Sequence, residues 1–83
     1  MELIVNQDWT FREAILNMRA LKKTYEDTLR SFSYFELPEK VKFERNFRSS
    51  IYSLNFEEWK KDRLWDYLNG FLFYEELISI ARK

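Results

Sequence analysis

The sequence predicts an all-α fold, a small antiparallel bundle of three helices, or of four if the last one is broken. Three observations predict it. Apolar residues recur at steps of three and four over the early part of the chain, which is the period of a helix. The 83 residues include one Gly and one Pro, which leaves little chain for loops. Eight Phe, five Tyr and three Trp can supply a dense core without metals or disulfides.

The first helix is expected from about residue 10 to residue 36. Thr10 and Glu13 have the spacing of a capping box, in which each side chain accepts a hydrogen bond from the other residue's backbone N–H. The apolar seam that follows is widened on one side, which favours a bundle helix over a two-stranded coiled coil. Its positions are Phe11, Ala14, Met18, Leu21, Tyr25, Thr28, Phe32 and Phe35, broken only by the polar Thr28, with Ile15 and Leu29 beside them.

A second helix is expected from about residue 38 to residue 53. Pro38 suits the first helical position, because the N–H that it lacks would have no partner there. An apolar face follows at steps of four, four and three, which a helix would present on one side. The residues of this face are Phe43, Phe47, Ile51 and Leu54.

A competing prediction makes residues 31–56 a short β-meander and the fold α+β. This segment contains three runs rich in the aromatic and β-branched residues that strands prefer. The two links between the runs, Pro-Glu-Lys and Arg-Ser-Ser, lack the Gly or Asn typical of a tight hairpin. We therefore favour the helix.

The third helix is expected from about residue 55 to residue 82. Asn55 is a suitable N-cap with Glu58 three residues on, and Leu54 and Trp59 have the spacing of a hydrophobic staple. These signals occur together, so they predict a helix start at this point.

The same helix has a candidate break at residues 69–70. Gly70 either ends it as a left-handed C-terminal residue or lies inside one longer helix. Beyond it, a helical face continues to the end of the chain through Phe73, Leu77 and Ile80. Residues 1–83 are expected to form a single domain.

The composition argues against an enzyme. The 14 Lys and Arg balance 14 Asp and Glu, so no overall field attracts nucleic acid or anionic lipid. There is no His to act as an acid or base near neutral pH, and no Cys for thiolate catalysis or metal binding. We expect no catalytic residue, metal or cofactor. The longest apolar run, near residues 71–74, is too short to span a membrane, and the cytoplasm is the default compartment.

The expected function is regulation or inhibition of a partner protein through an aromatic and charged helical surface. Three carboxylates recur every four residues, which puts them on one helix face. A straight row cannot surround a hard cation with oxygens, so it suits protein docking better than metal binding. Surplus Trp and Tyr near charges is typical of interfaces. The protein-binding residues predicted on this basis are Trp65, Tyr67, Tyr74, Glu58, Asp62 and Asp66. The long first seam also suggests a homodimer.

An alternative function is that of a nucleic-acid-associated regulator. Basic residues form a stripe on each of the first two expected helices, and those on the second interleave with Phe43 and Phe47. Proteins that bind single strands combine cations for phosphates with rings for base stacking. The residues of this alternative are Arg12, Arg19, Lys23, Lys42, Arg45 and Arg48. A third hypothesis is a purely structural subunit that forms a large homo-oligomer.

Overall fold

The computed structural model describes residues 5–82 and confirms the all-α bundle. Its elements are α1 (Phe11–Ser31), the short 3₁₀ turn η1 (Tyr34–Glu36), α2 (Leu37–Tyr52), α3 (Glu58–Leu68) and α4 (Tyr74–Ala81). The β-meander over residues 31–56 is wrong, since these residues form the end of α1, η1, α2 and a turn, and no strand occurs in residues 5–82. The helix is favoured because its period puts Phe43, Phe47 and Ile51 on the side of α2 that packs into the core.

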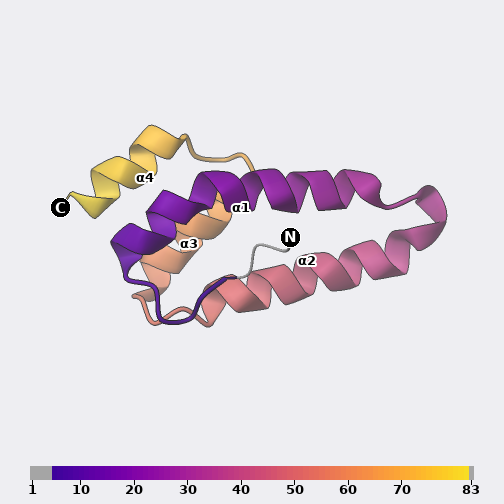
Figure 1. Cartoon of the computed structure of the whole chain (residues 1–83), viewed down its shortest axis with the longest axis horizontal. Coiled ribbons are helices and arrows are strands. Elements are labelled where there is room, and N and C mark those ends of the chain that lie inside the picture. The colour runs from indigo at the N-terminus through magenta and orange to yellow at the C-terminus, as the bar shows by residue number, and fades with distance from the viewer. Residues whose placement is uncertain (1–4, 83) are drawn as a thin grey trace.

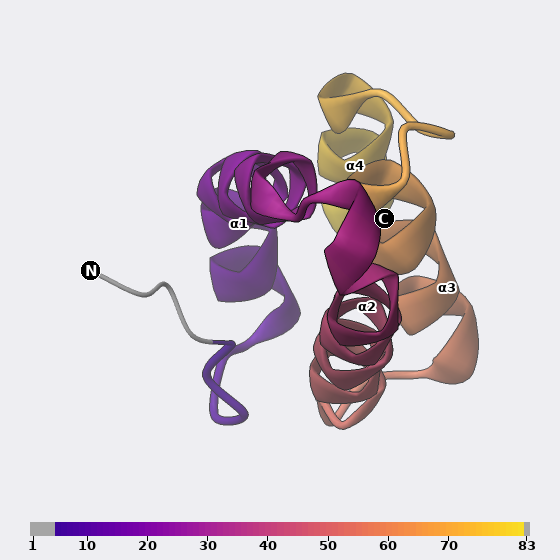
Figure 2. The ribbon, with the colours of Figure 1, turned by 90° about the vertical axis from the view of Figure 1, so that its right-hand side faces the viewer.

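α1 and α2 form an antiparallel hairpin that η1 closes at one end of the molecule (Figure 1). α3 packs against both helices of the hairpin, and α4 packs against α1 and α3. The closed end extends beyond α3 and α4, and Figure 2 views the molecule from that end. The molecule is therefore elongated, with extents of 44 × 24 × 23 Å.

The core lies where α1, α2 and α3 meet. The Tyr25 ring of α1 packs against Phe43 and Phe47 of α2, with ring centroids 5.9 and 4.9 Å away, and against Trp65 of α3 at 5.7 Å. Rings of this size fill the space between the helices. The buried apolar residues are Val5, Ala14, Ile15, Met18, Leu21, Tyr25, Ile51, Leu54, Leu64, Tyr67, Leu68 and Leu77.

α1 begins as predicted but ends five residues earlier than expected, at Ser31 rather than residue 36. Thr10 and Glu13 form the predicted capping box. The early end has a local cause. The Ser31 hydroxyl donates to the carbonyl of Thr28, and the Ser33 N–H donates to the Glu36 carboxylate over 3.0 Å. These bonds start a new turn, because side chains of this kind compete with the helix for backbone groups.

The start of α3 also differs from the prediction. Asn55 is not the N-cap: Glu57 takes that position, and its carbonyl accepts from the N–H groups of the first turn. Residues 53–56 instead form a turn that buries Leu54 and sets Phe56 against Phe11, with ring centroids 5.4 Å apart. Packing Leu54 and Phe56 into the fold stabilises this turn more than an N-cap at Asn55 would.

Gly70 breaks the last expected helix into α3 and α4. Its φ is +82°, a left-handed conformation that side chains disfavour. The Gly70 N–H bonds to the Tyr67 carbonyl, and the Phe71 N–H bonds to the Asp66 carbonyl, which together are the Schellman pattern that ends a helix. α4 then starts after Phe73, which is exposed and not on the core face as expected.

Candidate functional site

The three predicted acidic residues of α3 take part in contacts within the fold. Glu58 is exposed and pairs with Lys61, with 2.9 Å between carboxylate and Nζ. Asp62 is half-buried and accepts from the Tyr52 hydroxyl over 2.6 Å. Asp66 pairs with Arg63 at 3.5 Å. Within residues 5–82, no group of three carboxylates lies close enough to hold a metal ion.

The three predicted aromatic residues are also engaged inside the molecule. Trp65 is half-buried against Tyr25, and Tyr67 is only 6% exposed. The Tyr74 hydroxyl donates to the Ile15 carbonyl over 2.9 Å and so fastens α4 to α1. These rings contribute to the fold, and their contact with another protein stays a prediction.

Lys61 is a buried cation between α2 and α3. The residue is 8% exposed, and its Nζ donates to the Tyr52 carbonyl over 3.1 Å while pairing with Glu58. The Tyr52 carbonyl belongs to the C-terminal turn of α2, where the helix dipole is negative. Lys61 therefore joins the end of α2 to the start of α3.

Alkaline pH should weaken this junction through Tyr52. Burial, the largest cause, and the hydrogen bond to the Asp62 carboxylate raise the pKa of Tyr52 from 10.0 to about 12. The folded state thus favours the protonated hydroxyl, so its stabilisation is complete below pH 10 and is lost as the pH rises towards 12. We expect a loss of about 1 kcal/mol, because solvent screens a partly exposed group.

Urea unfolding of the wild type and of Tyr52→Phe, from neutral pH to pH 12, measures this effect. The variant should lose less stability than the wild type over the alkaline range. Burial also raises the pKa of Tyr25 and of Tyr67, so part of the alkaline loss should persist in the variant. An equally steep loss in both proteins would contradict the role given to Tyr52.

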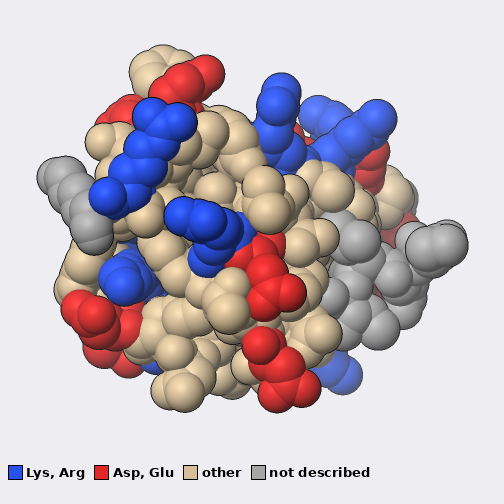
Figure 3. All heavy atoms as spheres, turned by 60° about the vertical axis from the view of Figure 1, so that its left-hand side comes forward, with Lys and Arg blue, Asp and Glu red and all other residues tan. Residues whose placement is uncertain are grey.

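The six basic residues of the nucleic-acid alternative are all exposed. Two of them lie over tyrosine rings: the Arg19 guanidinium is 5.2 Å from the Tyr74 ring centroid, and Arg48 is 5.5 Å from that of Tyr52. On the face in Figure 3, Lys and Arg side chains are intermixed with Asp and Glu and do not merge into one basic surface. Binding of nucleic acid by these residues stays a prediction.

A groove between α1 and α4 brings together residues from both functional predictions. Arg12 of the basic stripe and Tyr74 of the aromatic set both line it. Leu16, which the sequence analysis did not single out, forms an apolar wall and is 70% exposed. Ile15, Ile78, Ala81 and Arg82 complete the lining, and the groove has a volume of about 340 Å³.

The two most exposed of the large apolar side chains in residues 5–82 lie at the closed end of the hairpin, while Phe71 and Phe73, 79% and 76% exposed, lie on the link between α3 and α4. Tyr34 and Phe35 of η1 are each 90% exposed, and their rings touch edge to face at 5.8 Å. Leu37 and Val41, in the first turns of α2, are 58% and 46% exposed. We call these four residues the tip surface. The tip surface was not predicted from the sequence, because a helix running to residue 36 would place Phe35 in the core seam. The Ser33–Glu36 capping spacing was the signal that could have revealed it.

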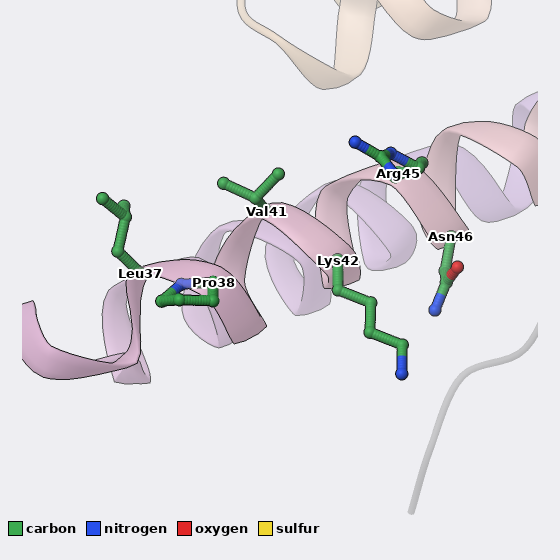
Figure 4. A pocket seen from close by; sticks show the side chains of 6 residues that line it. All are labelled: Leu37, Pro38, Val41, Lys42, Arg45 and Asn46. Carbon is green, nitrogen blue, oxygen red and sulfur yellow. The ribbon is translucent and has the colours of Figure 1, made fainter.

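The tip surface continues into a groove along the outer side of α2. We call it the α2 groove; its lining is Leu37, Pro38, Val41, Lys42, Arg45 and Asn46. Figure 4 shows two rows of side chains, one from Leu37 through Val41 to Arg45 and the other running through Lys42 to Asn46. Phe43 and Phe47 point the other way, onto Tyr25 of α1. Lys42 and Arg45 therefore line a groove of α2 alone, and not one shared with the basic stripe of α1.

None of the helices in the described part of the chain is long and apolar enough to cross a membrane. Comparison with known proteins gave no match to a family model, to a curated protein or to a solved structure. The arrangement of this chain's own surfaces, above all the tip surface, is therefore the basis for a proposal of function.

Proposed function

We propose that this protein is a small non-enzymatic interaction module that regulates or inhibits a partner protein, and that it binds through the tip surface. The observation that carries the proposal is the exposure of Tyr34 and Phe35, 90% each, beside Leu37 and Val41. Large apolar side chains gathered at one place on a surface mark sites of interaction. Aromatic residues are also among those that contribute most to binding energy.

The tip surface is held in place by the fold, which favours binding. The backbone of η1 is fixed by the Glu36 N–H bond to the Ser33 carbonyl, 2.9 Å, and by the Glu36 carboxylate. Behind it, Phe32 packs on Phe43 with ring centroids 6.0 Å apart. A surface ordered before binding loses less conformational entropy when a partner arrives.

The chemistry of the chain supports a binding role over catalysis. There is no His or Cys in the sequence to supply an acid, base or nucleophile. The acidic residues of α3 pair with Lys61, Arg63 and the Tyr52 hydroxyl. The proposal therefore needs no substrate and no cofactor.

The double substitution Tyr34→Ser, Phe35→Ser should strongly reduce capture of the partner. The tagged protein is incubated with an extract of the cells that produce it, with and without nuclease, and the retained proteins are identified by mass spectrometry. We expect one discrete protein that survives nuclease and falls by more than about tenfold with the variant, since interface aromatics often contribute ~2 kcal/mol each. Folding should be unaffected, because exposed substitutions change stability by about 0.5 kcal/mol or less.

Leu16→Ser is the matched control, because Leu16 is an exposed apolar residue on another surface. It should leave capture unchanged. Capture that survives the tip variant but fails with Leu16→Ser would move the interface to the groove between α1 and α4. Material that is lost on nuclease treatment, with retention that weakens steeply as salt rises, would replace the proposal by the nucleic-acid alternative.

A further inference from the structure

The outer side of α2 carries an excess of positive charge. Residues 37–52 include four basic and two acidic side chains, although the whole chain is neutral. Lys42, Arg45 and Arg48 are exposed, and within residues 5–82 none of them forms an ion pair. Of the two acids, Glu44 is half-buried, and its charge adds to burial, the larger cause, in raising the pKa of the Tyr25 hydroxyl, so it lies towards α1. The other acid, Glu39, is exposed, and within residues 5–82 it forms no ion pair with these cations.

The α2 groove has the shape that accepts another helix. Side chains four residues apart form ridges on a helix, and a second helix packs a ridge of its own into the groove between two of them. Here one ridge begins with Leu37 and Val41 and ends at Arg45, and the other contains Lys42 and Asn46 (Figure 4). The groove is apolar near the tip and basic farther along. From residue 37 to residue 46 it is about 14 Å long, at about 1.5 Å per residue.

We infer that the α2 groove binds an acidic amphipathic helix of the partner. The inference rests on the proposed function and names the chemistry of the partner segment. The apolar row of the partner helix packs on Leu37 and Val41, and the carboxylates of that helix pair with Lys42 and Arg45. Helix-in-groove recognition of this kind depends on apolar anchors at helical spacing, and complementary charges set the orientation. Aliphatic walls favour a peptide over a nucleic acid, whose bases need flat rings to stack on.

Three synthetic peptides of about four helical turns test the inference on the full chain. The first is an acidic amphipathic helix with Leu on one face and Glu beside it. The second has the same composition in scrambled order, and the third replaces each Glu by Lys. Amide chemical shifts should change at saturation with the first peptide, and the changes should be confined to η1 and the outer side of α2. The other two peptides should bind at least about tenfold more weakly.

Matched charge reversals locate the site. The double variant Lys42→Glu, Arg45→Glu should bind the acidic peptide about tenfold more weakly, or weaker still. Arg12→Glu with Lys23→Glu makes the same change of charge on α1 and should have little effect. Equal binding of the ordered and scrambled peptides, or shift changes centred on another surface, would overturn the inference. The inference would also be overturned if the protein sediments as a dimer and Val41→Asp dissociates that dimer, since a second copy of the chain would then cover the groove.

The captured partner separates this inference from the proposed function. If capture depends on Tyr34 and Phe35 but not on Lys42 and Arg45, the protein is an interaction module and the inference about the groove is wrong. If capture depends on neither pair, the proposed function itself fails. If capture depends on both residue pairs, and a photoreactive residue at position 46 cross-links to an acidic helix of the partner, then the proposed function and the inference about the groove both hold.

Discussion

Tyr25→Ala should lower the free energy of unfolding by about 3–5 kcal/mol, the range for removal of a large buried aromatic ring. Tyr25 is 2% exposed and packs against rings from two other helices, Phe43 and Phe47 on α2 and Trp65 on α3. Its removal leaves a cavity where three helices meet. Domains are typically stable by about 5–15 kcal/mol, so a chain this small would lose much of its stability. Urea unfolding followed by circular dichroism measures the change.

Tyr25→Phe is the matched control, because it keeps the ring and removes only the hydroxyl. It should change the stability by less than about 1 kcal/mol. Phe32→Ala should cost less than Tyr25→Ala, since Phe32 is half-buried and, within residues 5–82, packs on Phe43 alone among the rings. A Tyr25→Ala protein that unfolds at the wild-type urea concentration would show that α1 and α2 are held together in another way.

The inward face of α1 could be predicted from the sequence because helical period alone determines it. Ala14, Met18 and Leu21 are fully buried as expected, whichever helices cover them. The end of the helix could not be found in the same way, because Phe32 and Phe35 continue the spacing beyond it. A local hydrogen bond between Ser33 and Glu36 decides that boundary, and a period calculated over many residues does not detect it.

The candidate site was harder to predict, because exposure depends on neighbours that are distant in the sequence. Tyr74 was expected at a surface, but its hydroxyl bonds the Ile15 carbonyl, 59 residues away. Trp65 likewise meets Tyr25, which lies on another helix. Composition shows that aromatics are abundant but does not show which of them find partners. The aromatics that protrude most, Tyr34 and Phe35, do so because α1 ends before them.

Lys61→Glu should be the most damaging single change of charge, with an expected loss of about 3 kcal/mol. The substitution would bury a carboxylate beside Glu58 and facing the Tyr52 carbonyl, where Nζ now donates. The new charge would repel Glu58 and the negative C-terminal end of α2, and it could not accept a bond from a carbonyl. Because this junction joins α2 to α3, the loss should appear in the unfolding of the whole domain.

Lys61→Met separates the charge from the packing of the side chain. Met keeps most of the apolar stem, and replacing a buried ion by an apolar residue is often neutral, so we expect a loss of about 1 kcal/mol or less. Lys23→Glu makes the same charge change on the exposed side of α1 and should cost about 0.5 kcal/mol or less. Salt should restore part of the stability of Lys61→Glu, since it screens the repulsion from Glu58. Equal losses in the Met and Glu variants would assign the effect to the loss of the ammonium group, which both variants share, and not to repulsion of the new carboxylate.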